Sequence, residues 1–122
     1  MEKRLLYPTR LRKLPAQFSW IDQRLVREQH IDRLSHGAAA LYLFLSTVAD
    51  KNGLSYYSDR SLGRRLQMPT AQLNSARAEL VAADLIAYQS PLYQLLSLEA
   101  PPATQRGGMY SLKQIFQQMG GN

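Results

Sequence analysis

Two short helical segments separated by a sharp break constrain the fold of this chain more than any other feature of its sequence. In residues 60–67, Leu62 and Leu66 lie four positions apart, on one face of a helix. Met68-Pro69 ends this segment, because proline disfavours a helical conformation in the preceding residue and has no N–H to donate. We therefore expect a tight turn between two helices at this point.

The second helical segment, residues 71–84, has apolar residues on one side only. They follow steps of three and four: Leu73, Ala76, Leu80 and Ala83. Side chains suited to capping a helix N-terminus precede both segments. These are Ser58 or Asp59 before the first segment and Thr70 before the second. Each segment is thus expected to be an amphipathic helix with one buried face.

A third helix and a short strand precede the pair. Residues 36–50 are rich in Ala and Leu, which favours a helix buried on most of its surface, and Ser35 can cap its N-terminus. A Lys-Asn-Gly turn signal at residues 51–53 ends this helix, and residues 54–57 predict a short strand. The helix over residues 36–50 is expected to lie at the centre of the core.

Two apolar, partly alternating runs follow the pair of helices. Residues 85–88 and 92–98 flank a turn at Ser90-Pro91, a pattern typical of a β-hairpin. Near the other end of the chain, residues 18–34 predict a strand followed by a short helix or turn. The elements together predict an α+β fold that is mainly helical.

This order of elements resembles the winged helix-turn-helix superfamily, especially the winged-helix domains of plasmid and phage replication initiators and related DNA-binding regulators. The resemblance rests on residues 41–45, 51–54, 61–80 and 84–86, and it covers residues 35–98. It implies a short two-stranded hairpin as the wing. It also implies that the packing positions of the helix pair are Leu62, Gly63, Leu66, Met68, Leu73 and Leu80, with Gly63 where a small residue lets the helices approach.

The organisation expected along the chain has three parts. Residues 1–14 form a basic N-terminal arm, in which Pro8 interrupts any long helix. Residues 15–100 form the winged helix-turn-helix domain. Residues 101–122 form a linker and a short amphipathic tail helix, whose apolar residues share one helical register: Met109, Leu112, Ile115, Phe116 and Met119.

Charge points to an anionic partner. The formal net charge is +6, and no Lys or Arg occurs in residues 34–50 or 84–102, so the basic residues are concentrated on particular elements.

The chain has no cysteine, which excludes disulfides and thiolate-ligated metal sites. No run approaches the roughly 18 apolar residues that span a bilayer, and the start lacks the features of a secretion signal, so a cytoplasmic protein without a membrane partner is expected.

The helix over residues 70–84 is the expected reader of a DNA major groove, because that groove admits one helix. The residues on and beside its polar face are Thr70, Ala71, Gln72, Asn74, Ser75, Arg77 and Ala78. Asn74 and Gln72 can each make paired hydrogen bonds to adenine, and Arg77 can pair with guanine or a phosphate. Small residues on this face would let the helix sit deep in the groove.

Two further basic groups are expected at the DNA. Arg60, Arg64 and Arg65 lie on the preceding helix, where backbone phosphates would run. The arm carries Lys3, Arg4, Arg10, Arg12 and Lys13, which either follow a minor groove or lie free. The function expected from this pattern is sequence-selective binding of double-stranded DNA in replication, mobile-element or transcription regulation.

The hairpin departs from a DNA-binding wing because residues 85–98 include no Lys or Arg. Its apolar and aromatic residues are Tyr88, Leu92, Tyr93, Leu95 and Leu96. They either complete the core or, with the tail helix, form a homodimer surface. The alternative function is therefore a protein–protein interaction module that uses a winged-helix scaffold through its uncharged hairpin and tail helix.

An enzymatic function is not expected. His30 and His36 are not part of a cluster with metal-ligand spacing, and the chain has neither a glycine-rich phosphate loop nor a nucleophile motif. No cofactor, metal or small-molecule substrate is therefore predicted.

Overall fold

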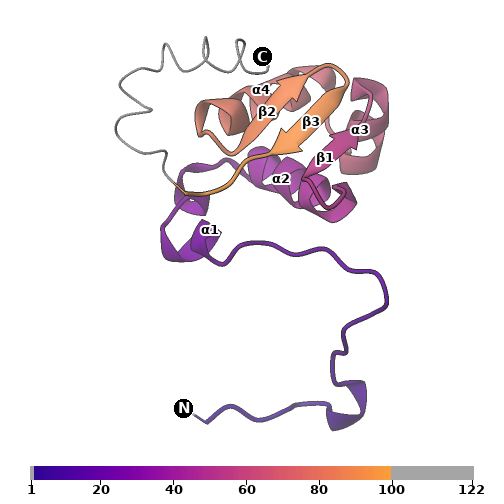
Figure 1. The fold of residues 1–122 in the computed structure, drawn as a ribbon, viewed down its shortest axis with the longest axis vertical. Coiled ribbons are helices and arrows are strands. Elements are labelled where there is room, and N and C mark those ends of the chain that lie inside the picture. Colours follow the sequence, from indigo (N-terminus) through magenta and orange to yellow (C-terminus); the bar gives the residue numbers. More distant parts are fainter. Residues whose placement is uncertain (1, 100–122) are drawn as a thin grey trace.

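A computed structural model describes residues 2–99 of the chain (Figure 1). The α-helices are α1 (Arg24–Arg27), α2 (His36–Val48), α3 (Asp59–Leu66) and α4 (Thr70–Ala82). The strands are β1 (Leu54–Tyr56), β2 (Ile86–Gln89) and β3 (Leu92–Leu95), and short 3-10 helices cover Pro8–Arg10 and Ile31–Arg33. The described part is thus an α+β fold, as expected, and the predicted tail helix lies outside the described residues.

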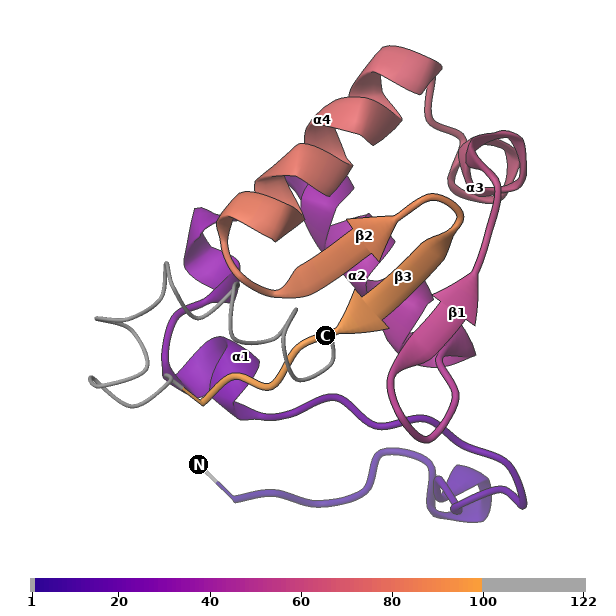
Figure 2. The ribbon, with the colours of Figure 1, turned by 45° about the horizontal axis from the view of Figure 1, so that its top comes forward.

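The core lies between α2, α4 and the sheet. In Figure 2, α2 passes behind the sheet, and it packs against both α4 and β3. Its residues Leu41 and Leu45 are almost fully buried, as are Leu73 and Leu80 of α4. Each such leucine contributes about 1.5 to 3 kcal/mol through removal from water. The predicted central position of the helix over residues 36–50 is therefore confirmed.

The predicted packing positions of the helix pair are also buried or partly buried. Leu62, Met68, Leu73 and Leu80 belong to the core, and Leu66 packs against it. Gly63 is close to the turn rather than to a second helix, since a Cβ there would lie 3.0 Å from the carbonyl oxygen of Met68. The Met68 amide donates to the Gly63 carbonyl at 2.9 Å, which holds the turn against the end of α3.

The sheet has the order β1-β3-β2, with both neighbouring pairs antiparallel. The predicted hairpin is confirmed, and its turn lies at Ser90-Pro91. It is not a separate two-stranded element, however, because β3 also pairs with β1, placing Tyr93 opposite both Ser55 and Tyr88. Tyr93 is 1% exposed and Ile86 is also buried, so one side of the hairpin completes the core.

The turn before β1 requires a glycine. Gly53 has φ +83°, which places it in the left-handed region, and a Cβ there would lie 3.2 Å from the carbonyl oxygen of Leu95. The Gly53 carbonyl accepts a hydrogen bond from the Leu95 amide at 2.9 Å. This turn therefore also extends the contact between β1 and β3.

Two of the three predicted helix caps are confirmed. The Ser35 hydroxyl accepts from the Ala38 amide at 3.1 Å, and the Ser58 hydroxyl accepts from the Ser61 amide at the same distance. The prediction that Thr70 caps the next helix is wrong. Pro69 takes the N-cap position with an extended ψ of 157°, and Thr70 is already the first helical residue.

The prediction of a strand within residues 18–34 is also wrong. This segment contains α1 and the 3-10 helix Ile31–Arg33 but no strand, since neither edge of the sheet pairs with it. Phe18 and Trp20 remain exposed instead of packing in a sheet face. A hydrogen bond of 2.7 Å from the Ser19 hydroxyl to the Thr47 carbonyl connects this segment to the end of α2.

Candidate nucleic-acid interface

Most of one side of α4 is exposed, although the Gln72 side chain lies over Gly37 of α2, where an added Cβ would be 3.1 Å from its Nε2. Three residues of the helix are buried, Leu73, Ala76 and Leu80. The predicted contact residues on the other side are exposed: Thr70, Ala71, Gln72, Asn74, Ser75 and Ala78. Because most of these side chains are short, the helix presents a narrow polar ridge, with its backbone close to the surface.

The three arginines of α3 lie on a helix that packs against α4. Arg60, Arg64 and Arg65 are all exposed, and the guanidinium of Arg65 lies 5.6 Å from the centre of the Phe44 ring. That distance is typical of a cation–π contact, which orients the guanidinium without removing it from solvent. The helix pair thus carries three accessible cations on α3 in addition to the polar ridge of α4, and one of these cations, Arg65, lies against α2.

Arg77 does not belong to the free part of this surface. Its side chain is only 11% exposed, and its Nε donates to the hydroxyl oxygen of Tyr93 at 3.1 Å. Its Nη2 forms an ion pair with Asp59 of α3, and its guanidinium lies 4.4 Å from the centre of the Tyr88 ring. The structure therefore places Arg77 between α4, α3 and the hairpin, where its donors already serve intramolecular partners.

The electrostatics of this cluster favour the ionised form of the arginine. Burial alone would lower the pKa of Arg77, but the hydrogen bond to Tyr93 and the charge of Asp59 raise it above its ordinary value. Burial also raises the pKa of Tyr93, although the hydrogen bond from Arg77 opposes this effect. The cluster is thus a permanently charged arginine with a neutral tyrosine and a carboxylate as its acceptors.

Asn74 has an intramolecular partner that the sequence analysis did not assign. Its side-chain oxygen accepts from Nη1 of Arg77 at 3.1 Å, although the residue itself is exposed. The spacing of three positions could have indicated this contact, because residues three apart are neighbours on a helix surface. Asp59 and Tyr93 could not have been found in this way, since they reach Arg77 from 18 and 16 residues away.

The basic residues of the arm are exposed but are not brought together with α4. In Figures 1 and 2, the N-terminal segment, residues 2–21, extends from the side of the domain where α1 lies, whereas α4 lies on the opposite side. All five side chains are accessible: Lys3, Arg4, Arg10, Arg12 and Lys13. The arm and α4 therefore do not form one continuous surface.

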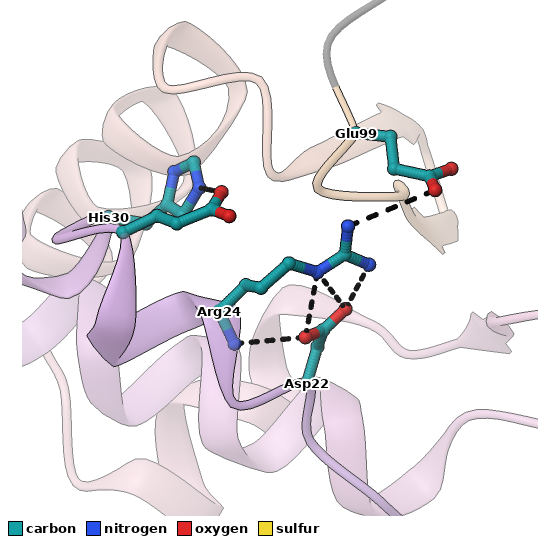
Figure 3. Close-up of polar contacts among 5 residues, drawn as sticks. Asp22, Arg24, His30 and Glu99 are labelled. Carbon is teal, nitrogen blue, oxygen red and sulfur yellow. Dashed lines mark hydrogen bonds and ion pairs between the residues drawn. The ribbon is translucent and has the colours of Figure 1, made fainter.

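A separate polar cluster lies at the start of α1 (Figure 3). Arg24 forms a two-pronged ion pair with Asp22, with a shortest distance of 2.6 Å, and its Nη1 lies 3.8 Å from the carboxylate of Glu99. Hydrogen bonds from the side chain and the backbone amide of Arg24 lower the pKa of Asp22 to about 2. This cluster connects α1 to the chain that follows β3.

The same region borders a groove of about 570 Å³. The N-terminal segment, α2 and residues 95–98 line it, and Asp22, Arg24 and Tyr42 are among its polar groups. Within residues 2–99, no three side chains of the metal-ligating types lie close enough together to hold a metal ion.

Other proteins give no further indication of the role of these surfaces. Comparisons with models of protein families, with curated proteins and with solved structures each found no match. In the part of the chain that the structure describes, no helix has the length and apolar character needed to cross a membrane.

Proposed function

We propose that this chain is a winged helix-turn-helix protein that binds double-stranded DNA sequence-selectively, with α4 in the major groove. The observation that carries the proposal is the exposed polar ridge of α4, together with three exposed arginines on α3, the helix that packs against α4. The order of α2, β1, α3, α4 and the β2–β3 hairpin supports it, because that order is the one implied by the resemblance in the sequence.

The physical argument assigns different tasks to the two helices. A helix whose outer face carries Ala71, Ser75 and Ala78 can approach base edges closely, and Gln72 and Asn74 supply hydrogen-bonding groups there. Arg60, Arg64 and Arg65 on α3 are suited to phosphate contacts, which position the protein without reading the sequence. A net charge of +6 favours such contacts through counterion release.

The proposal extends to a cytoplasmic role in replication, mobile-element movement or transcription, all of which require recognition of particular DNA sites. A homodimer through the hairpin would have to use the side chains that lie outside the core. Tyr93 and Ile86 are core residues, and the strand faces of β2 and β3 leave mainly polar or small side chains exposed, such as Gln89 and Gln94. The tail helix lies outside the described residues.

The test is the double variant Arg64→Ala with Arg65→Ala, measured by fluorescence anisotropy on random-sequence duplex at several salt concentrations. Removing two phosphate-binding side chains should weaken binding and make the slope of log K against log salt less steep by about 1.8. Arg27→Ala with Lys51→Ala is the matched control, because both side chains are exposed on parts of the chain outside α3 and α4. Equal affinity of the Arg64/Arg65 variant and the parent would refute the proposal.

One observation favours the second candidate function, a protein–protein interaction module. Large apolar side chains are exposed in the N-terminal segment, among them Leu6, Leu14 and Trp20. This surface differs from the hairpin and tail helix that the sequence analysis assigned to the module. If the parent chain binds no duplex at low salt, the interaction module becomes the better description.

A further inference from the structure

The orientation of the Asn74 carboxamide is determined by its partner. Arg77 has only donors, so the group of Asn74 that lies 3.1 Å from its Nη1 must be the carbonyl oxygen and not the amide nitrogen. The oxygen therefore faces Arg77. The amide nitrogen, with its two hydrogens, is the end of the exposed side chain that remains for a ligand.

Arg77 is itself fixed on three sides. Its Nε donates to Tyr93 of β3, its Nη2 pairs with Asp59 of α3, and the ring of Tyr88 lies 4.4 Å from its guanidinium carbon. With a side chain that is 11% exposed, it has little room to turn away from Asn74. Residues of α3 and of the hairpin thus hold Arg77 in place. Arg77 in turn fixes the direction of the Asn74 oxygen.

This arrangement changes which base edge Asn74 suits. The paired contact of asparagine with adenine uses both ends of the carboxamide, since the oxygen accepts from the adenine amino group while the nitrogen donates to N7. Here one of the two lone pairs of the oxygen already accepts from the Arg77 guanidinium, whose positive charge repels the hydrogens of an approaching adenine amino group. Guanine presents two acceptors in the major groove, N7 and O6, and no donor.

We infer that Arg77 is a positioning residue that turns the oxygen of Asn74 towards the protein and its amide nitrogen towards the base, so that α4 selects guanine, and not adenine, at the base pair facing Asn74. The inference rests on the proposed function, because it specifies how the same helix reads DNA. It replaces the adenine contact predicted for Asn74, and it replaces direct base contact by Arg77 with an indirect role.

The first experiment is a selection from random duplexes with the parent and with Asn74→Ala, followed by affinity measurements on the preferred duplex. The position at which Asn74→Ala relaxes the preference should be guanine in the parent. Replacing this base by 7-deazaguanine, which lacks the N7 acceptor, should weaken parental binding about tenfold and Asn74→Ala binding very little. Asn74→Asp, which has acceptors only, should lose the guanine preference.

The second experiment tests the role of Arg77 through base preference, which a purely structural role would not change. Lysine keeps the charge but cannot donate to Asn74, Asp59 and Tyr93 at once. Arg77→Lys should therefore lower the preference for guanine over adenine about fivefold at this position alone. Arg27→Lys is the matched control, as Arg27 is exposed on α1, and thermal melts of all variants establish that they are folded.

Should Arg77→Lys fail to fold, Asp59→Asn provides the same test, because it removes the carboxylate charge that holds Arg77 and leaves Asn74 unchanged. Asp59→Asn should also lower the preference for guanine over adenine, by a smaller factor than Arg77→Lys.

A parent that selects adenine at this position, or folded Arg77 and Asp59 variants with the parental preference, would overturn the inference while DNA binding stands. A parent that binds no duplex at low salt would remove the proposed function and the inference together.

Discussion

The N-terminal segment, residues 2–21, and the domain that follows it contain the same kinds of side chain and use them in opposite ways. In the domain, leucines such as Leu41 and Leu80 are fully buried, and Arg24 and Arg77 have carboxylate partners. In the segment, every residue is exposed, including Leu6 at 81% and Trp20 at 74%, and its basic residues take part in none of the ion pairs found within residues 2–99.

The difference shows that apolar residues become core only where the backbone around them forms an element that can pack against others. In α4 the apolar residues recur every three or four positions and form one stripe on an uninterrupted helix, whereas Pro8 and Pro15 interrupt the segment and prevent one continuous helix. The segment therefore contributes little to stability. Its accessible cations and apolar groups are available for an intermolecular contact.

The largest expected effect compares a leucine from each region. Leu80→Ala should lower the free energy of unfolding by about 2 to 5 kcal/mol, because it leaves a cavity in the core. Leu14→Ala should change it by less than about 0.5 kcal/mol. Urea unfolding followed by circular dichroism measures both, and similar losses for the two variants would contradict the division into a stable domain and a non-contributing segment.

Deletion of residues 2–14 should separate binding from stability. The deleted part carries five of the basic residues assigned to DNA contact, so duplex binding should weaken across all sequences. The slope of log K against log salt should become less steep by about 0.9 for each phosphate that the shortened chain no longer neutralises. The melting temperature and the preferred sequence should stay as in the parent, since point charges position a protein without reading bases. A changed site preference would show that the arm reads the DNA directly.

A smaller effect is expected at the turn between α3 and α4. Gln67 has φ +55°, in the left-handed region that non-glycine residues rarely adopt. Gln67→Gly should therefore stabilise the domain by about 0.5 to 1 kcal/mol, because the relief of strain in the folded chain exceeds the added entropy of the unfolded one. Thermal unfolding tests this, with Gln89→Gly in β2 as a control that should destabilise. A loss of stability in Gln67→Gly would mean that the turn is not strained.

The smallest effect is expected from Asp22, where the two regions meet. Its folded pKa of about 2 lies below the ordinary value of 3.8, so its ionised form stabilises the folded state above about pH 4. That contribution is lost as the pH falls from about 4 towards 2. Asp22→Asn should accordingly reduce the acid-induced loss of stability in this interval, whereas Asp32→Asn, an exposed carboxylate without an ion pair in the described structure, should not. Identical acid titrations of the parent and Asp22→Asn would contradict this role.

Local signals in the sequence were sufficient for most of the domain. The leucine spacing in residues 60–84, the Met68-Pro69 break and the Ser90-Pro91 turn each correspond to an element or turn of the structure. These features depend on neighbours a few residues away. The exposed ridge of α4 followed from the same periodicity, because the buried stripe determines which residues face outward.

The sequence was insufficient where distant residues decide the outcome. The place of Arg77 at the edge of the polar face gives no indication that Asp59 and Tyr93 reach it. Phe18 and Trp20 have the residue types of a strand, but a strand also needs a partner, and the sheet offers none to them. Position on a helix thus predicts exposure better than it predicts hydrogen bonding.

The position of β3 has a consequence for how the domain is made. β3 is the last strand in the described part of the chain and the middle strand of the sheet, and every strand pairing there involves it, because β1 and β2 do not pair with each other. During synthesis from the N-terminus, the contacts within α2, α3 and α4 are local and become possible early, but the sheet has no pairing until residues 92–95 have emerged. A chain that stopped before Leu92 would contain two of these three strands and none of their pairings.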